Sequence, residues 1–201
     1  AEAWRNGDVD AAMGVGRRIV DEIIQNPRVT LDLIDLRSYD DYTYRHSVNV
    51  AVISTVIGIN MQLNRLALDE LSIAAILHDI GKRRIDPKII NKKGKLTPEE
   101  YTEVKHHSEY GYEMVKSRID LSAKIKNAIL LHHENEDGSG YPKGLKGNQI
   151  FIYAKIIHVA DVFDALTAKR PYKKAYAQSE AAEYLMGSCD RMFDREVVKA
   201  F

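Results

Sequence analysis

Between residues 67 and 82 the chain reads Ala67-Leu-Asp-Glu-Leu-Ser-Ile-Ala-Ala-Ile-Leu-His-Asp-Ile-Gly-Lys82. The spacing of Leu71, Ala74 and His78 places them on one face of a helix that we expect to end at His78. Asp79 follows directly, and an ionised carboxylate beside an apolar face is costly to bury without a partner. The pair predicts either a metal site or a helix cap with a nearby salt bridge.

Helical periodicity dominates the rest of the chain, and strand patterns are nearly absent. We expect further helices at about residues 2–25, 40–59, 97–116, 122–133, 151–168 and 179–189, and a last one within 194–201. Thr97-Pro98-Glu99-Glu100 is a strong helix start, with an N-cap, a first-turn proline and a capping-box glutamate. Residues 80–96 read as a loop. The prediction is an all-α helical bundle.

Composition excludes several classes of protein. Lysine plus arginine equals aspartate plus glutamate, 29 against 29, so no global charge favours a nucleic-acid polymer or a membrane surface. The one cysteine, Cys189, cannot form an internal disulfide and fits a reducing compartment. No apolar run reaches the ~20 residues that cross a bilayer. We therefore expect this part to be cytoplasmic, within a full-length protein that could be membrane-attached.

Five histidines and two aspartates fall on inward helix faces or at helix ends: His46, His78, Asp79, His107, His132, His133 and Asp161. Each could be explained alone, as a hydrogen-bonded core histidine, a helix-end coincidence or an aspartate paired with a lysine. Together they come from several helices, and bundles build metal sites from inward side chains of facing helices. A two-metal site needs a bridging carboxylate and several neutral imidazoles, which these residues supply. His106 is expected in solvent. His158, one turn before Asp161, is expected in the core or at the surface, with a place behind a metal ligand as the alternative.

An ordered series of motifs surrounds these residues. It consists of Tyr42-Thr-Tyr-Arg-His-Ser47, Leu77-His-Asp-Ile-Gly-Lys82, His107-Ser-Glu-Tyr-Gly111, His132-His-Glu134, Asp137-Gly-Ser-Gly-Tyr-Pro142, Gly144-Leu-Lys-Gly147, Asp161-Val-Phe-Asp-Ala-Leu-Thr167 and Arg170-Pro-Tyr-Lys173. In these motifs the chain resembles the HD-GYP family, a branch of the HD-domain phosphohydrolases, over about residues 40–201. The resemblance implies the helical bundle of the HD-domain phosphohydrolases.

The resemblance also implies roles for individual residues. One metal would be held by His46, His78, Asp79 and Asp161, and a second by the bridging Asp79 with His107, His132 and His133. Asp79 and Lys82 would be the catalytic residues, with Lys82 near the scissile phosphate. Substrate contacts would come from Lys82, Tyr141 of the Gly-Tyr-Pro loop, Arg170 and Lys173. The loop's glycines would let backbone amides approach a ligand closely.

The implied activity is hydrolysis of cyclic di-GMP to linear pGpG, or on to GMP, by metal-activated hydroxide. The implied cofactors are two divalent metal ions, with iron or manganese first and nickel or zinc as alternatives. Some relatives hold a third metal with a glutamate one turn before the first histidine. Here that position is Tyr42, which argues against a third metal and favours pGpG as the product.

Two rival functions remain open. The chain could be an HD phosphohydrolase acting on another cyclic dinucleotide such as cGAMP, or a non-catalytic module that binds cyclic di-GMP and signals. We divide the chain into a connector helix region, 1–35, and a catalytic domain, 36–201, that reads as cut short at its C-terminal end. An upstream sensory or receiver domain is expected to be missing. The connector could pair two copies into a homodimer or pack on its own bundle.

Overall fold

The computed structural model describes residues 8–26, 42–168 and 175–201. Its helices are α2 (Val9–Gln25), α4 (Tyr42–Asn60), α5 (Arg65–Leu77), η1 (Ile80–Arg84), α6 (Pro87–Ile90), α7 (Pro98–Lys105), α8 (His107–Val115), α9 (Ala123–Leu131), η2 (Gly147–Gln149), α10 (Ile152–Thr167), α11 (Gln178–Gly187) and α12 (Arg195–Ala200). The described part of the chain contains no strand, so the predicted all-α class is confirmed. No helix in it is long and apolar enough to cross a bilayer.

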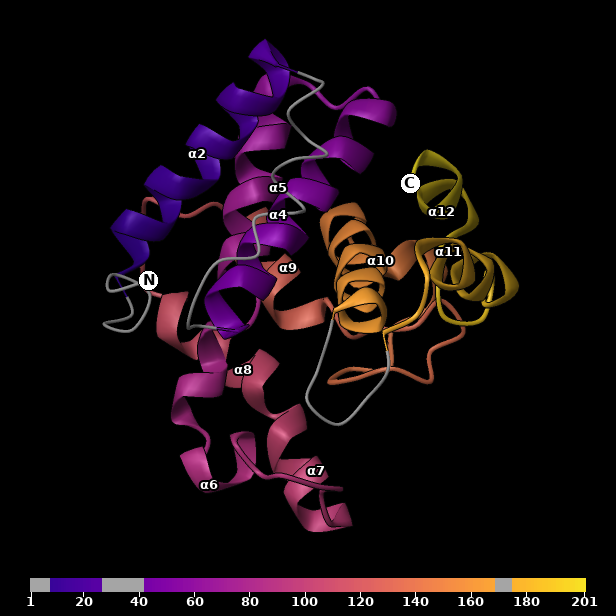
Figure 1. Ribbon diagram of the computed structural model, residues 1–201. Helices are drawn as coiled ribbons and strands as arrows, with labels where there is room; N and C mark the ends of the chain where they lie inside the picture. Colours follow the sequence, from indigo (N-terminus) through magenta and orange to yellow (C-terminus); the bar gives the residue numbers. More distant parts are fainter. Residues whose placement is uncertain (1–7, 27–41, 169–174) are drawn as a thin grey trace.

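The hydrophobic core lies between α4, α5 and the helices around them (Figure 1). Helix α5 contacts α2, α4 and α9, and α10 contacts α4 and α9. Ile57, Leu71, Ile129 and Ile156, one from each of α4, α5, α9 and α10, are fully buried. Because large apolar side chains lock these helices together, polar groups on their inner faces are held in fixed positions.

Helix α2 packs its apolar stripe on α5 of the same chain. Ile19 and Ile23 are buried, and the hydroxyl of Ser72 donates to the carbonyl of Gly16 at 2.9 Å. Gly16 allows this approach, because a Cβ there would lie 3.0 Å from the backbone nitrogen of Ile73. The apolar stripe of α2 is thus covered by its own bundle, which is one of the two alternatives that we considered for this helix. A homodimer stays a prediction.

The helix predicted over residues 97–116 is wrong in one respect, because it is broken at His106 into α7 and α8. The Nδ1 atom of His107 donates to the carbonyl of Val104 at 2.7 Å, so the ring takes a carbonyl that a continuous helix would bond to its own backbone. Residues 80–96 also differ from the expected loop, since they contain the short helices η1 and α6.

The backbones of η1 and α8 pack closely against each other at Gly81 and Gly111. A Cβ on Gly81 would lie 1.9 Å from the carbonyl oxygen of His107 and 2.4 Å from the nitrogen of Gly111. No other residue fits at position 81 without separating the two segments. Since η1 begins directly after Asp79 and α8 begins with His107, this contact sets the distance between two predicted ligands.

Candidate metal centre

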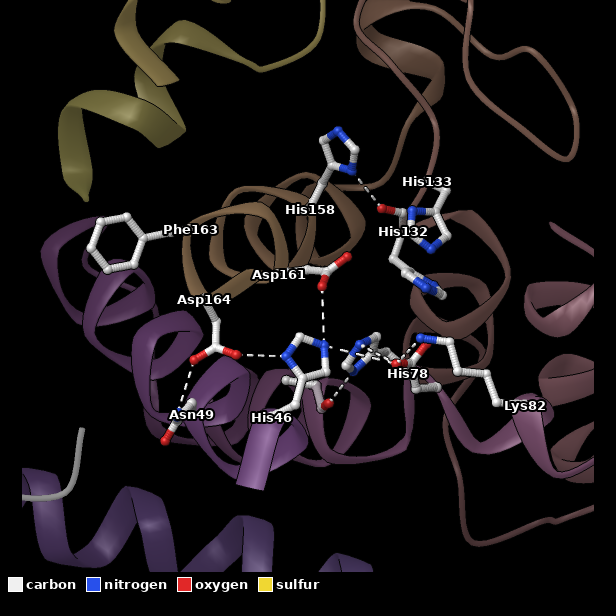
Figure 2. Close-up of polar contacts among 12 residues, drawn as sticks. His46, Asn49, His78, Lys82, His132, His133, His158, Asp161, Phe163 and Asp164 are labelled. Carbon is white, nitrogen blue, oxygen red and sulfur yellow. Dashed lines mark hydrogen bonds and ion pairs between the residues drawn. The ribbon is translucent and has the colours of Figure 1, made fainter. Parts of the chain in front are cut away.

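The seven predicted ligands converge from five parts of the fold, and Figure 2 shows His46, His78, His132, His133 and Asp161 among them. His46 lies on α4, His78 and Asp79 follow α5, His107 begins α8, His132 and His133 follow α9, and Asp161 lies on α10. They include two groups that could hold a metal ion, one of His46, His78 and Asp79 and one of His107, His132 and His133. Within each group the ligand atoms lie within 4.8 Å of one another.

Asp79 stands between the two groups and offers one carboxylate oxygen to each. Its Oδ1 lies 3.3 Å from Nε2 of His107. Its Oδ2 lies 3.4 Å from Nε2 of His78 and 3.8 Å from Nε2 of His46. Asp161 closes the first group, with Oδ1 3.1 Å from Nε2 of His46. This is the arrangement that a bridging carboxylate between two cations requires.

Three of the histidines are oriented by carbonyls in the last turn of the helix that precedes them. Nδ1 of His78 donates to Ala75, Nδ1 of His107 to Val104 and Nδ1 of His132 to Ile129, at 2.7, 2.7 and 2.8 Å. A carbonyl only accepts, so Nδ1 carries the proton and Nε2 of a neutral ring keeps its lone pair. Helix ends have carbonyls without backbone partners, which explains why ligands of this kind sit there.

Several buried atoms at the centre make no hydrogen bond within the described residues. They include Nε2 of His78 and Oδ1 of Asp79. The Nε2 atoms of His107 and His132 face each other at 3.2 Å, as do those of His133 and His107. Buried lone pairs that face one another are costly unless a cation or proton lies between them. The donor set therefore fits divalent metal ions with mixed imidazole and carboxylate ligands.

The pKa shifts of four histidine ligands go in opposite directions in the two metal groups. Burial lowers the pKa of His107, His132 and His133, which keeps these rings neutral and able to bind metal. Burial also disfavours a charged His46, but Asp161 and Asp164 raise its pKa to about 10. His46 must therefore release a proton when a metal binds.

The aspartates stay ionised in spite of their burial. Burial opposes ionisation, but Lys82 and His78 hold the pKa of Asp79 well below its usual range, and His46 does the same for Asp161. Both carboxylates are thus charged at neutral pH, as metal ligands must be.

Lys82 and Tyr141, two of the predicted substrate contacts, lie at the edge of this centre. The Nζ atom of Lys82 is 2.5 Å from Oδ2 of Asp79, and its side chain is about one-third exposed. The ring of Tyr141 stacks on His133, with centroids 4.7 Å apart and planes at 27°. Arg170 and Lys173, the other predicted substrate contacts, lie outside the described residues.

The Gly-Tyr-Pro loop is held by Glu134, whose role the sequence reasoning missed. This buried carboxylate accepts from the backbone nitrogens of Lys143 at 2.6 Å and Leu145 at 2.9 Å. A Cβ on Gly140 would lie 2.4 Å from the carbonyl of His133, so this glycine is needed for the packing of the loop, and the approach of a ligand to its glycines stays a prediction. The peptide bond from Tyr141 to Pro142 is cis.

Asp164 and Asn49 were also missed. Oδ2 of Asp164 lies 2.7 Å from Nδ1 of His46, and its Oδ1 accepts from Nδ2 of Asn49 at 2.8 Å (Figure 2). The available signal was the spacing of Asp164, one turn after Asp161 on an apolar helix. His158 is buried, as expected for a core residue, and donates from Nδ1 to the carbonyl of His132 at 2.8 Å.

Comparisons with known proteins identify a family and several relatives of this chain. The family model described as "HD domain" matches residues 28–197. The chain is 38% identical over 187 residues to the cyclic di-GMP phosphodiesterase PA4108 of Pseudomonas aeruginosa, covering 91% of this chain and 45% of that protein. It is 41% identical over 132 residues to the 3'3'-cGAMP-specific phosphodiesterase 2 of Vibrio cholerae, covering 65% and 25%. The chain thus spans less than half the length of these relatives.

A solved structure shares the fold. Bd1817, described as an HDG"Y"P protein from Bdellovibrio bacteriovorus, superposes with a TM-score of 0.81 over 99% of this chain and 65% of that chain. At 20% identity the likeness shows the fold alone. The helical architecture is therefore shared with a more distant sequence.

Proposed function

Since the chain belongs to the HD-domain family, we propose that it is a metal-dependent phosphodiesterase that hydrolyses cyclic di-GMP to linear pGpG. The observation that carries the proposal is the position of Asp79, with one oxygen toward His107 and the other toward His46 and His78. A single-metal site would leave the group of His107, His132 and His133 without a purpose.

We assign one metal to His46, His78, Asp79 and Asp161, and the other to Asp79, His107, His132 and His133. When bound, two divalent ions would acidify a water molecule at neutral pH and neutralise charge on the phosphodiester. The neutral imidazoles and ionised aspartates described above are the protonation states that this binding needs. The ligand types favour iron or manganese, with nickel or zinc as alternatives, and Tyr42 argues against a third metal.

Lys82 supplies the protein's own positive charge beside the reacting phosphate. Its ammonium lies against Asp79 at the edge of the centre, where a phosphate bound to the metals would meet it. A fixed cation there stabilises negative charge that grows on the phosphate oxygens during hydrolysis. Tyr141, with Arg170 and Lys173 from the segment outside the described residues, would complete the substrate contacts.

The names of the relatives support the choice of substrate. Proteins named cyclic di-GMP phosphodiesterases match over 91% and 85% of this chain, while those named for 3'3'-cGAMP also match. cGAMP is therefore the second candidate substrate. The alternative to catalysis is that the chain is a non-catalytic receptor for cyclic di-GMP. The remainder of a longer protein, expected to be an upstream sensory or receiver domain, and a cytoplasmic location for this part stay predictions.

Turnover of cyclic di-GMP by the purified chain, loaded with iron or manganese under reducing conditions, tests the proposal. Linear pGpG from the native chain and none from Asp79→Ala is the expected result. Faster turnover of 3'3'-cGAMP than of cyclic di-GMP would make cGAMP the assigned substrate. GMP as the end product would contradict the two-metal assignment. Tight binding of cyclic di-GMP without turnover, despite two bound metals, would establish the receptor function instead.

A further inference from the structure

One face of α7 points toward the Gly-Tyr-Pro loop. Tyr101 and Lys105 lie one turn apart on this helix, and the Nζ atom of Lys105 is 5.4 Å from the ring centroid of Tyr101. The same ammonium is 5.9 Å from the ring of Tyr141, which stacks on His133. An uninterrupted series of ring and cation contacts therefore runs outward from a proposed metal ligand to Tyr101.

We propose that Tyr101 and Lys105 form a guanine-binding subsite for the cyclic dinucleotide, with Tyr101 stacking on the base and Lys105 contacting its edge. The inference rests on the proposed function, and it names which part of the substrate meets α7. Neither residue belongs to the motifs that carry the family resemblance, so nothing in those motifs accounts for the pair.

Tyr101 has the surface that stacking needs. Tyr101 is 54% exposed, so a flat ligand can cover its ring without displacing core residues. Bases stack on aromatic side chains through their π faces, and a cation near the ring strengthens the contact.

Lys105 is held where it can read the edge of a purine. Two rings from different elements, α7 and the loop, flank its ammonium. No carboxylate of the described residues forms an ion pair with it, so its donors are not committed to a salt bridge. Lysine donates to O6 and N7 of guanine, whereas adenine presents an amino group in place of O6. The pair therefore favours guanine over adenine.

Steady-state kinetics of the metal-loaded chain with variants at position 101 test the subsite. Tyr101→Ala is expected to raise KM for cyclic di-GMP about tenfold, the loss of one stacked base. Tyr101→Phe keeps the ring face and is expected to restore the native KM within about twofold. The matched control is Tyr184→Ala, a half-exposed tyrosine on α11 outside the site, which should match the native chain.

Two further readouts separate the subsite from general damage and from the proposed function. With the base-free diester bis(p-nitrophenyl) phosphate, the loss caused by Tyr101→Ala should be much smaller than with cyclic di-GMP. Lys105→Ala should weaken the binding of cyclic di-GMP, measured as KM, more than the binding of cyclic di-AMP, measured as an inhibition constant. Equal KM values for Tyr101→Ala and the native chain, or equal losses on both diesters, would overturn the subsite. Metal-dependent hydrolysis of the base-free diester without binding of cyclic di-GMP would overturn both the subsite and the proposed substrate.

Discussion

Asp164 holds the ring of His46 through a contact of 2.7 Å between Oδ2 and Nδ1, and Asn49 holds Asp164 in turn. Of the seven proposed ligands, His46 is the one whose Nδ1 contacts a carboxylate in the described residues, whereas His78, His107 and His132 bond carbonyls. A carboxylate behind a ligating histidine orients the ring and raises its basicity.

The first prediction concerns that carboxylate. Asp164→Ala is expected to weaken binding of the metal that His46 holds by about 10- to 100-fold, because the ring loses its orientation and charge partner. Metal titration by calorimetry measures the effect. Asn49→Ala, which removes only the contact behind Asp164, should cause a smaller loss. Native affinity in Asp164→Ala would show that the carboxylate has no part in metal binding.

Gly81 gives a steric prediction. Gly81→Ala is expected to lower the free energy of unfolding by about 3 kcal/mol, since its Cβ would overlap the carbonyl of His107 and force η1 away from α8. Chemical denaturation measures the change. The matched control is Gly14→Ala on the exposed face of α2, where nothing lies within 4 Å. That variant should gain up to about 1 kcal/mol. A neutral Gly81→Ala would mean that the two segments are not in close contact.

Glu134 gives a prediction about loop order. Glu134→Gln places an amide N–H group opposite the backbone nitrogens of Lys143 or Leu145, which both need an acceptor. We expect faster hydrogen exchange at these two amides and a several-fold lower kcat/KM for cyclic di-GMP. Exchange at the amides of Ala128 and Ile129 in α9 serves as the internal reference. Unchanged protection of Lys143 and Leu145 would contradict the role of the carboxylate.

Lys155 links the loop to the C-terminal helix. Its buried ammonium lies 2.8 Å from Oδ2 of Asp194, the N-cap of α12, and 3.1 Å from Oε2 of Glu136 in the loop. Lys155→Met is expected to cost about 2–4 kcal/mol of stability, because two partly buried carboxylates lose their partner. Lys155→Arg, which keeps the charge, should lose less. Equal stability of Lys155→Met and the native chain would show that the cluster contributes nothing.

The same cluster has a pH dependence. Burial opposes ionisation of Asp194, but Lys155 and the backbone nitrogens of Val197 and Glu196 hold its pKa below the ordinary value. A carboxyl whose pKa is lower in the folded chain stabilises the fold above about pH 4 and loses this effect as the pH falls through the folded pKa. The stability difference between the native chain and Lys155→Met should therefore shrink in acid. A difference that grew below pH 4 would contradict the assignment.

Apolar spacing was sufficient for α2, whose buried residues Gly16, Ile19 and Ile23 repeat at three- and four-residue intervals. On α5 and α10 the central residues are buried on all sides, so it was their continuous apolar content that indicated core helices. Neither signal could locate the break at His106, since the cause is a side-chain bond from His107 to a carbonyl and not a change in the apolar pattern. Short helices such as α6 carry too few residues for a periodic signal.

The candidate site was predictable where a polar group interrupts an apolar face, as at His46 and Asp161. The structure brings all seven such residues together, and their role as ligands stays a prediction. Asp164 and Glu134 were missed because their partners, His46 on another helix and two loop amides, are set by tertiary packing. The spacing of Asp164 from Asp161 indicates that the two share a helix face, but it does not identify His46 as the partner.

The number of metal ions bound per chain tests the central claim most directly. Mass-spectrometric metal analysis of the native chain, His46→Ala and His133→Ala after loading and desalting gives this number. We predict two ions in the native chain and one in each variant, because the two histidines belong to different groups joined by Asp79. A native chain that holds a single ion, or a His133→Ala variant that still holds two, would contradict the two-metal centre.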